Sequence, residues 1–231
     1  MSLWNHIALT GDPLLDSRFG RLFAPREPLL SRLGRRLAPA LLALSVLAMV
    51  PTAAEPAMKP TPAYLKAKKP IGAPAGFGNL CGKYDWLCSS TGRKARASRS
   101  DLDLATRINA EVNRKTHQIS DIQQYGRSEY WALPTSRGGD CEDIALLKKM
   151  KLVAVGIRPE TLLIATALDR KRNPHAVLVM RTEFGDVVLD NLSSRIKHWS
   201  ETGYSFLKMQ NPARPANWDA IFTGGIFGTK A

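Results

Sequence analysis

The chain has 231 residues and a formal net charge of +13 at pH 7, with 33 Lys and Arg residues against 20 Asp and Glu residues. This length holds one domain or two small ones. The charge favours anionic partners, but the basic residues are scattered rather than striped, and no nucleic-acid-binding motif accompanies them. We therefore expect a soluble basic surface and no nucleic-acid partner.

Residues 1–54 are predicted to be a leader and signal peptide. Arginine residues precede an apolar run from Leu37 to Val50, and the small residues that follow, up to Ala54, suit cleavage by signal peptidase. The rival interpretation is a retained membrane anchor, but a run of about fourteen residues is short of the roughly twenty that span a bilayer. Residues 1–31 are long for a charged leader and are consistent with an over-extended translation start. We expect a periplasmic or secreted protein with no stable membrane span after cleavage.

Residues 55–77 are rich in Pro, Ala and Lys, which is typical of an extended tether, and residues 78–231 are expected to form the folded domain. Near the start of that domain lie Cys81 and Cys88, and an exported protein meets oxidising conditions that favour a local disulfide. A zinc site is the poorer alternative, because no second Cys pair or His pair lies at ligand spacing. The disulfide would leave Cys141 as the odd thiol.

Two helices are predicted in the first half of this domain. The first is expected to be capped by Ser100 or Asp101 and to run to about Ile119, because apolar residues recur every four positions and form one stripe. The second is expected to follow a glycine-containing loop, with Asp140 as its cap and Gly156 at its end. Few positions of this second helix are polar, so we expect it to be mostly buried.

Short apolar runs separated by turn residues follow the helices, and they predict strands at Thr161–Leu168, His175–Met180, Val187–Asp190 and Tyr204–Met209. The order of these elements predicts an α+β domain in which helices pack on an antiparallel sheet.

Three residues form a candidate catalytic group. Cys141 lies at the start of the second helix, where unpaired backbone N–H groups and the helix dipole favour a thiolate. His175 opens one predicted strand and Asp190 closes the next, so a hairpin would bring them to the same end. The spacing therefore predicts a thiol nucleophile, a histidine base and an aspartate that orients the base.

Three carboxylates beside the nucleophile, those of Asp140, Glu142 and Asp143, argue against simple activation of Cys141, because nearby negative charge raises the pKa of a thiol. One explanation is that these residues cap N–H groups at the helix start. The other is a bound hard cation, with Ca²⁺ as the expected ion, which takes oxygen ligands. The absence of EF-hand spacing favours capping when the residues are considered alone.

Trp131, about ten residues before the cysteine, is expected on the wall of the site. Its indole N–H is a candidate donor to the oxyanion formed during acyl transfer, together with the Cys141 backbone N–H. The alternative is ordinary core packing.

Short motifs follow one another along the chain in a specific order: Trp131, Pro134, Gly139-Asp140-Cys141-Glu142-Asp143, His175-Ala176-Val177-Leu178 and Val188-Leu189-Asp190-Asn191. Together they resemble the bacterial transglutaminase-like cysteine proteinases, the family of LapG-like periplasmic proteases, over roughly Phe77 to Asn211. The resemblance implies a papain-like, transglutaminase-like α+β fold and a Cys-His-Asp triad made of Cys141, His175 and Asp190.

The same resemblance implies that Asp140, Glu142 and Asp143 bind Ca²⁺, which shifts the preference slightly from capping alone to a calcium site. It also implies a protein substrate, a large biofilm adhesin on the cell surface, and an inner-membrane receptor that senses cyclic di-GMP and restrains the protease. We therefore predict an exported cysteine endopeptidase. Two alternatives stay open: an acyl transferase or amidase of transglutaminase type, and a non-catalytic basic binding module on the same scaffold.

Overall fold

The structure is a computed structural model that describes residues 63–93 and 95–228. The predicted leader and signal peptide, residues 1–54, and the first part of the predicted tether, residues 55–62, lie outside the described residues. Among the helices that are described, none combines the length and the apolar character needed to cross a bilayer.

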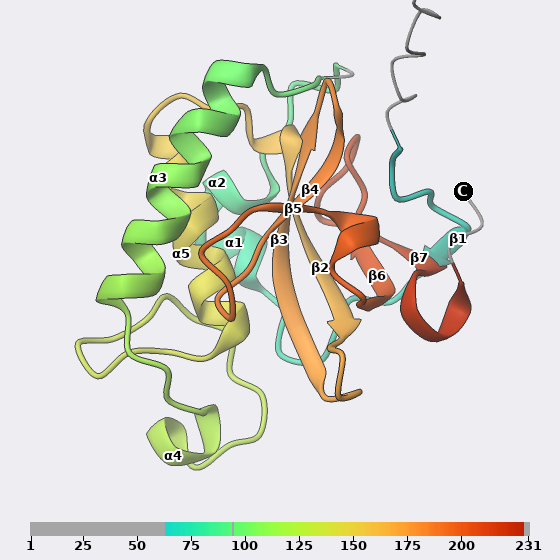
Figure 1. The fold of residues 1–231 in the computed structure, drawn as a ribbon. Coiled ribbons are helices and arrows are strands. Elements are labelled where there is room, and N and C mark those ends of the chain that lie inside the picture. The colour runs from blue at the N-terminus through green and yellow to red at the C-terminus, as the bar shows by residue number, and fades with distance from the viewer. Residues whose placement is uncertain (1–62, 94, 229–231) are drawn as a thin grey trace, which may run out of the picture. The chain divides into compact units, whose positions relative to one another are not determined.

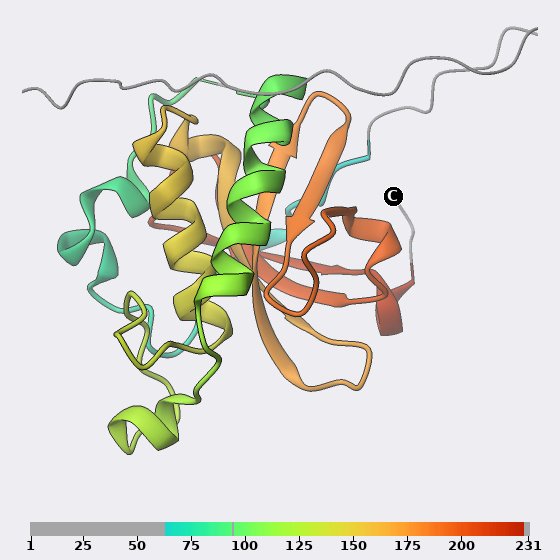
Figure 2. The ribbon, with the colours of Figure 1, turned by 60° about the vertical axis from the view of Figure 1, so that its left-hand side comes forward.

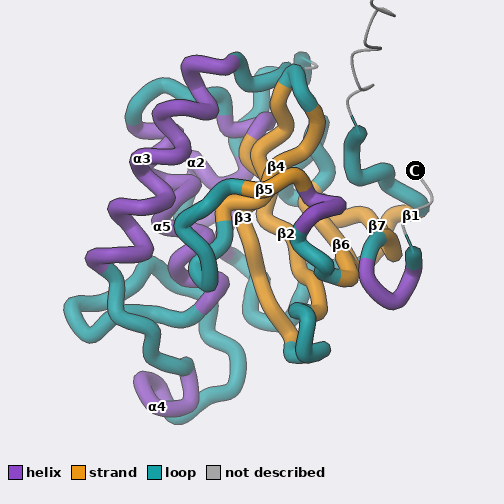
Figure 3. The backbone as a smooth tube through the Cα atoms, viewed as in Figure 1, coloured by secondary structure: helices purple, strands orange, loops and turns teal. Residues whose placement is uncertain are grey.

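The described residues build one seven-stranded sheet in which every pair of neighbouring strands is antiparallel. The strand order across the sheet is β1-β7-β6-β2-β3-β4-β5 (Figure 3). In chain order the strands are β1 Lys69–Ile71, β2 Leu162–Leu168, β3 Pro174–Thr182, β4 Gly185–Leu189, β5 Lys197–His198, β6 Ser205–Gln210 and β7 Trp218–Thr223.

Helices cover one face of this sheet (Figures 1 and 2). The two longest, α3 and α5, lie side by side there, and the short α4 projects beyond them at the end of the molecule where α5 begins. The α-helices are α1 Leu80–Lys83, α2 Asp85–Cys88, α3 Arg99–Lys115, α4 Asp121–Tyr125 and α5 Cys141–Ala154; three short 3₁₀ helices are η1 Pro159–Thr161, η2 Trp199–Glu201 and η3 Gly225–Phe227. The predicted α+β architecture, with helices packed on an antiparallel sheet, is confirmed.

The sheet has a hydrophobic layer on each face. Because successive side chains of a strand point to opposite faces, β2 places Ile164 among the helices and Leu163 in the second layer. The second layer is closed by Leu65, from the segment before β1, and by Trp199 of η2. Burial on both faces explains why β2 and β3 are near-continuous apolar runs rather than alternating ones.

The two long helices differ from their predicted bounds mainly at the ends of α3. Its cap is Ser98, not Ser100 or Asp101, and Asp101 completes a capping box by accepting from the Ser98 backbone N–H. The helix ends at Lys115, four residues before the predicted end. The α5 helix follows the prediction, since most of its residues are buried and Gly156, at φ 94°, lies just beyond its end.

Residues 63–77 correct the prediction of an extended tether. Leu65 is 2% exposed, and its backbone N–H and C=O are bonded to the side chains of Asp186 and Arg181. Strand β1 pairs with β7, and Phe77 is buried in the helix-side core. Composition alone was misleading here, because much of what holds this segment is hydrogen bonding by its own backbone groups, which composition does not report.

The cysteines have the predicted states. Cys81 of α1 and Cys88 of α2 are joined in a disulfide. Cys141 is a free thiol.

Candidate active site

The β3–β4 hairpin brings His175 and Asp190 together. His175 is the second residue of β3, and Asp190 directly follows the last residue of β4, which pairs with Leu178. The distance from His175 Nε2 to Asp190 Oδ1 is 2.9 Å, and both side chains are buried. The histidine and the aspartate therefore meet as the hairpin argument predicted, although fifteen residues separate them.

A tyrosine that the sequence did not single out completes the surroundings of the aspartate. The Tyr204 hydroxyl donates to Asp190 Oδ2 at 2.5 Å, and the Leu192 backbone N–H donates to Oδ1 at 3.0 Å. Burial acts to raise the pKa of Asp190, but the hydrogen bonds from His175, Tyr204 and Leu192 outweigh it and lower that pKa. The Tyr204 ring also stands edge-on to the imidazole, with centroids 5.5 Å apart. Asp190 is thus held as an anion against the imidazole.

The sulfur of Cys141 lies beside the first residues of β3. The Ala176 backbone N–H donates to Sγ at 3.3 Å, and the thiol donates to Glu142 Oε2 at 3.1 Å. Cys141 and His175 both line one cleft, which has a volume of about 320 Å³. Nε2 of the imidazole is engaged by Asp190, so Nδ1 is the nitrogen left for the thiol.

Trp131 also lines this cleft and is 4% exposed, so its predicted place on the wall is observed. Its indole N–H donates to Glu129 Oε2 at 3.3 Å. The oxyanion role stays a prediction, and it requires this N–H to exchange Glu129 for the substrate.

The electrostatic setting of the cysteine opposes its ionisation. Burial and then the charge of Glu142 raise the pKa of the Cys141 thiol, against a smaller lowering by the Ala176 N–H. Burial, with the adjoining Asp140 carboxyl group, raises the pKa of Glu142 to about 9. The sequence had pointed to this conflict, and the helix start alone does not resolve it.

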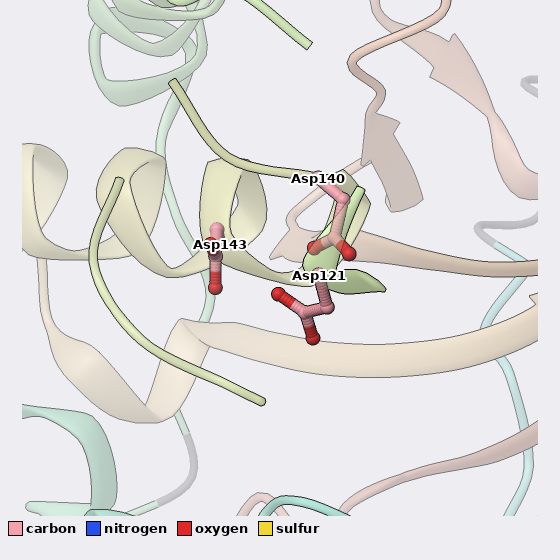
Figure 4. Close-up of side chains that lie close together, drawn as sticks. All are labelled: Asp121, Asp140 and Asp143. Carbon is pink, nitrogen blue, oxygen red and sulfur yellow. The ribbon is translucent and has the colours of Figure 1, made fainter. Parts of the chain in front are cut away.

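Three aspartates gather next to the nucleophile: Asp121 of α4, Asp140 just before α5 and Asp143 in its first turn (Figure 4). One ligand oxygen from each lies within 4.8 Å of the others. Two opposite ligands of a calcium ion, at about 2.4 Å each, are separated by about that distance. The spacing therefore suits a hard cation with oxygen ligands.

Each of these carboxylates also has one buried oxygen without a hydrogen-bond partner among the described residues. The second oxygen of Asp121 accepts from the Tyr130 backbone N–H, and that of Asp143 accepts from the Ala132 N–H at 2.8 Å. Burial, and then the charges of Asp140 and Asp121, raise the pKa of Asp143 to about 7. Buried and partnerless oxygens are costly, so this group fits a bound cation.

The predicted capping role of Asp140 is wrong at the level of the side chain. Asp140 occupies the N-cap position of α5, but its carboxylate makes no capping hydrogen bond. One oxygen of this carboxylate, Oδ1, is buried without a hydrogen-bond partner among the described residues. Of the two explanations weighed from the sequence, the observed geometry favours the cation.

The observed group differs from the predicted ligand set in one member, because it contains Asp121 where the sequence suggested Glu142, and the ligand set itself stays a prediction. Residues three apart share one side of a helix start, which places Asp143 with Asp140, whereas Glu142 is turned toward the Cys141 sulfur. Asp121 lies about twenty residues upstream in a five-residue helix, and no local pattern distinguished it from other helix-start acids.

The glycines before the cysteine make room for this arrangement. A Cβ at Gly139 would stand 2.7 Å from Asp143 Oδ2, so only glycine lets this carboxylate turn back over the loop. Gly138 has φ 117°, and a Cβ there would meet the His117 carbonyl oxygen at 2.0 Å.

The family model described as bacterial transglutaminase-like cysteine proteinase matches residues 67–225. No curated protein is significantly similar in sequence.

Among solved structures, calcium-bound LapG from Legionella pneumophila shares 26% identity, with 54% of this chain and 71% of that chain covered and a TM-score of 0.45. EGTA-treated LapG from the same organism shares 29% identity, with 48% and 63% covered and a TM-score of 0.42. A third structure of that LapG shares 27% identity, with 48% and 65% covered and a TM-score of 0.42.

Proposed function

Because the chain belongs to the bacterial transglutaminase-like cysteine proteinases, we propose that it is a thiol endopeptidase with Cys141, His175 and Asp190 as its catalytic triad. The observation that carries this proposal is one cleft in which the sulfur accepts the N–H that follows His175 while Asp190 holds the imidazole at 2.9 Å. Nucleophile, base and orienting carboxylate are the parts that acyl transfer through a thiol requires.

The chemistry follows from these contacts. His175 Nδ1 accepts the proton of Cys141 as the sulfur attacks the carbonyl carbon of a substrate peptide bond. The imidazolium then returns the proton to the leaving amine, and Asp190 stabilises the cation in between. Water hydrolyses the acyl-enzyme, with His175 again accepting the proton. The hydrogen bonds from His175, Tyr204 and Leu192 favour the ionised form of Asp190, which this stabilising role requires.

We further propose that Asp121, Asp140 and Asp143 bind Ca²⁺. The support is their spacing and their three buried oxygens without partners. When bound, the ion supplies positive charge that offsets the carboxylates and favours the Cys141 thiolate. The chain itself holds the ligands in place, through the N–H groups that fix Asp121 and Asp143.

The substrate and the location are proposals that rest on the sequence and the family. A predicted signal peptide and a disulfide fit export to the periplasm or beyond. A protein of the cell surface, such as a biofilm adhesin, is then the proposed substrate, and a membrane receptor is the proposed regulator.

Alkylation of the single free thiol tests the proposed catalytic centre without a known substrate. We expect iodoacetamide to label Cys141 at pH 6 in the presence of Ca²⁺, because the imidazole accepts the thiol proton. His175→Ala should slow labelling about 100-fold or more, in the range of general-base contributions. His198→Ala is the matched control, since that histidine bonds Ser200 and the Ala63 carbonyl.

Equal labelling of the parent and the His175→Ala variant would refute the proposed nucleophile–base pair. A parent thiol that reacts only above pH 8 would favour the non-catalytic binding module. Incorporation of a labelled amine into protein, rather than cleavage, would favour the acyl transferase. Surface proteomics of cells with parent or Cys141→Ala enzyme would identify the substrate as the protein released only by the parent.

A further inference from the structure

A second cavity, of about 180 Å³, is distinct from the catalytic cleft and adjoins the aspartate of the proposed triad. Asp190 and Tyr204 form part of its lining, and it has no lining residue in common with the cleft. Neither the proposed proteolysis nor the proposed calcium site uses it.

Three cationic side chains converge on this cavity from separate segments. Arg170 comes from the β2–β3 turn, Arg195 from the loop after β4, and Lys197 opens β5. None of the three forms an ion pair with a described carboxylate. Asp190 is the one acid in the lining, and its oxygens already accept hydrogen bonds from the triad histidine, Tyr204 and a backbone N–H. The described lining therefore carries three positive side chains against the single negative charge of Asp190.

The Arg170 guanidinium is held in place at the rim. Its Nε donates to the Thr202 carbonyl at 2.9 Å, which leaves the two terminal nitrogens for another partner. Gly203, at φ 75°, permits this approach, because a Cβ there would stand 3.3 Å from Arg170 Nε.

The loop that carries Arg195 is also held in place, by contacts with α3. Asn109 of α3 is completely buried, and its amide donates to the carbonyls of Ser193 and Ser194 at 3.3 and 3.1 Å. The Ser193 hydroxyl accepts from the Arg195 backbone N–H at 3.2 Å and sets the turn. A fixed loop and a fixed guanidinium together make a pre-organised site, which lowers the entropy lost on binding.

From this arrangement we infer that the cavity binds an oxyanion, a carboxylate or a tetrahedral anion, between Arg170, Arg195 and Lys197. Guanidinium groups bind planar and tetrahedral oxyanions through paired N–H donors, and an ammonium adds a third charge. Leu192, 55% exposed at the same cavity, offers apolar contact to whatever molecule carries the anion. The anion is either a free ion or an acidic side chain of a bound protein.

Isothermal titration calorimetry with two probes separates these sources. Sulfate represents the free oxyanion, and a tetraglutamate peptide represents the acidic side chain, with tetraglutamine as its uncharged counterpart. The protein used is the Cys141→Ala variant with calcium. This variant cannot cleave the peptides, so the experiment measures binding alone, and a negative result leaves the proposed proteolysis untouched. We expect saturable binding of at least one anionic probe and none of tetraglutamine.

Arg170→Gln and Arg195→Gln should each weaken that binding about tenfold, which corresponds to about 1.4 kcal/mol. Lys171→Gln is the matched control, because it is exposed in the same turn as Arg170 but does not line the cavity, and it should bind as the parent does. Sulfate binding would assign a free anion, and binding of the glutamate peptide alone would assign an acidic protein segment. The inference is overturned if neither probe binds saturably, or if both arginine variants bind as tightly as Lys171→Gln.

Discussion

Replacing Asp121 with Asn should change the stability of the protein in opposite directions with and without calcium. The aspartate lies with Asp140 and Asp143 in the group whose ligand oxygens are within 4.8 Å of one another. An Asn side chain keeps an oxygen that can accept the Tyr130 N–H, which Asp121 now accepts, but it removes one negative charge. Without the ion this relieves repulsion, and with the ion it removes a charged ligand.

The magnitudes follow from these distances. Two unit charges 4.8 Å apart repel by about 3.5 kcal/mol at an effective dielectric constant of about 20. Partial protonation relieves much of this, since the pKa of Asp143 is already raised to about 7, so a gain on the order of 1 kcal/mol is expected for the ion-free variant. At a calcium concentration of about 100 Kd, the parent gains about 2.7 kcal/mol, or roughly 5–10 °C in Tm for a domain of this size. If the loss of the charged ligand weakens calcium affinity about 100-fold, the Tm shift of the variant at the same calcium concentration falls to about 1 °C.

Differential scanning calorimetry of the parent and variants, in EGTA and in calcium, measures both effects. Two controls bracket the result: Asp103→Asn removes an exposed acid of α3, and Glu142→Gln removes an acid beside the thiol that lies outside the three-aspartate group. Both should keep most of the calcium shift. The reasoning fails if Asp121→Asn melts below the parent in EGTA, or if calcium raises its Tm as much as it raises that of the parent.

Three further changes have defined outcomes. Tyr204→Phe removes the donor 2.5 Å from Asp190 and raises the pKa of that carboxylate, so the acid limb of the pH profile for Cys alkylation should move upward, with a loss of about tenfold on that limb. An unmoved limb would show that Tyr204 only fills space. Burial lowers the pKa of Lys149 from 10.5 to about 7, so the unfolded state binds the extra proton between these values and stability rises with pH. Lys149→Met should remove its share of that slope, up to about 1.4 kcal/mol per pH unit in urea titrations from pH 7 to 10, and an unchanged slope would contradict this. Replacing Cys81 and Cys88 with Ser opens a disulfide-closed loop with a sequence separation of 7. The free energy of unfolding, measured by urea unfolding, should fall by about 2–3 kcal/mol relative to the parent. Equal stability of parent and variant would contradict a contribution from loop entropy.

The sequence predicted those parts of the fold that local pattern determines. Strands β2, β3, β4 and β6 were found because each is an apolar run between turn residues, and α5 because a cap and a glycine bound it. Strands β1 and β5 were missed because they have three and two residues and exist through pairing with longer strands. Strand β7 was missed as well, although it pairs with β6 over much of its length. Such pairing is a property of the whole sheet, and no local pattern reports it.

The candidate site shows the same division. The sequence placed His175 and Asp190 at one end of a hairpin, and the observed contact agrees, while the triad as a catalytic unit stays a prediction. It did not identify Asp121 or Tyr204, because each acts through a contact made only after folding. It included Glu142 in the predicted metal set because this residue flanks the nucleophile and the family resemblance implies a ligand there, whereas the observed Glu142 carboxylate accepts from the Cys141 thiol.

The acidic group also bears on the shape of the cleft, because it holds the segment that contains Trp131. Asp121 accepts the N–H of Tyr130, and Asp143 accepts the N–H of Ala132, so the tryptophan lies between two residues that are fixed by the same carboxylates. A cation shared by these carboxylates would join α4 to α5 and set the position of the cleft wall as well as the charge near the sulfur. The two effects are separable, since a small alkylating reagent senses only the thiolate, whereas a peptide substrate also needs the wall. Calcium removal that slows proteolysis far more than alkylation would therefore show that the ion acts chiefly on the wall.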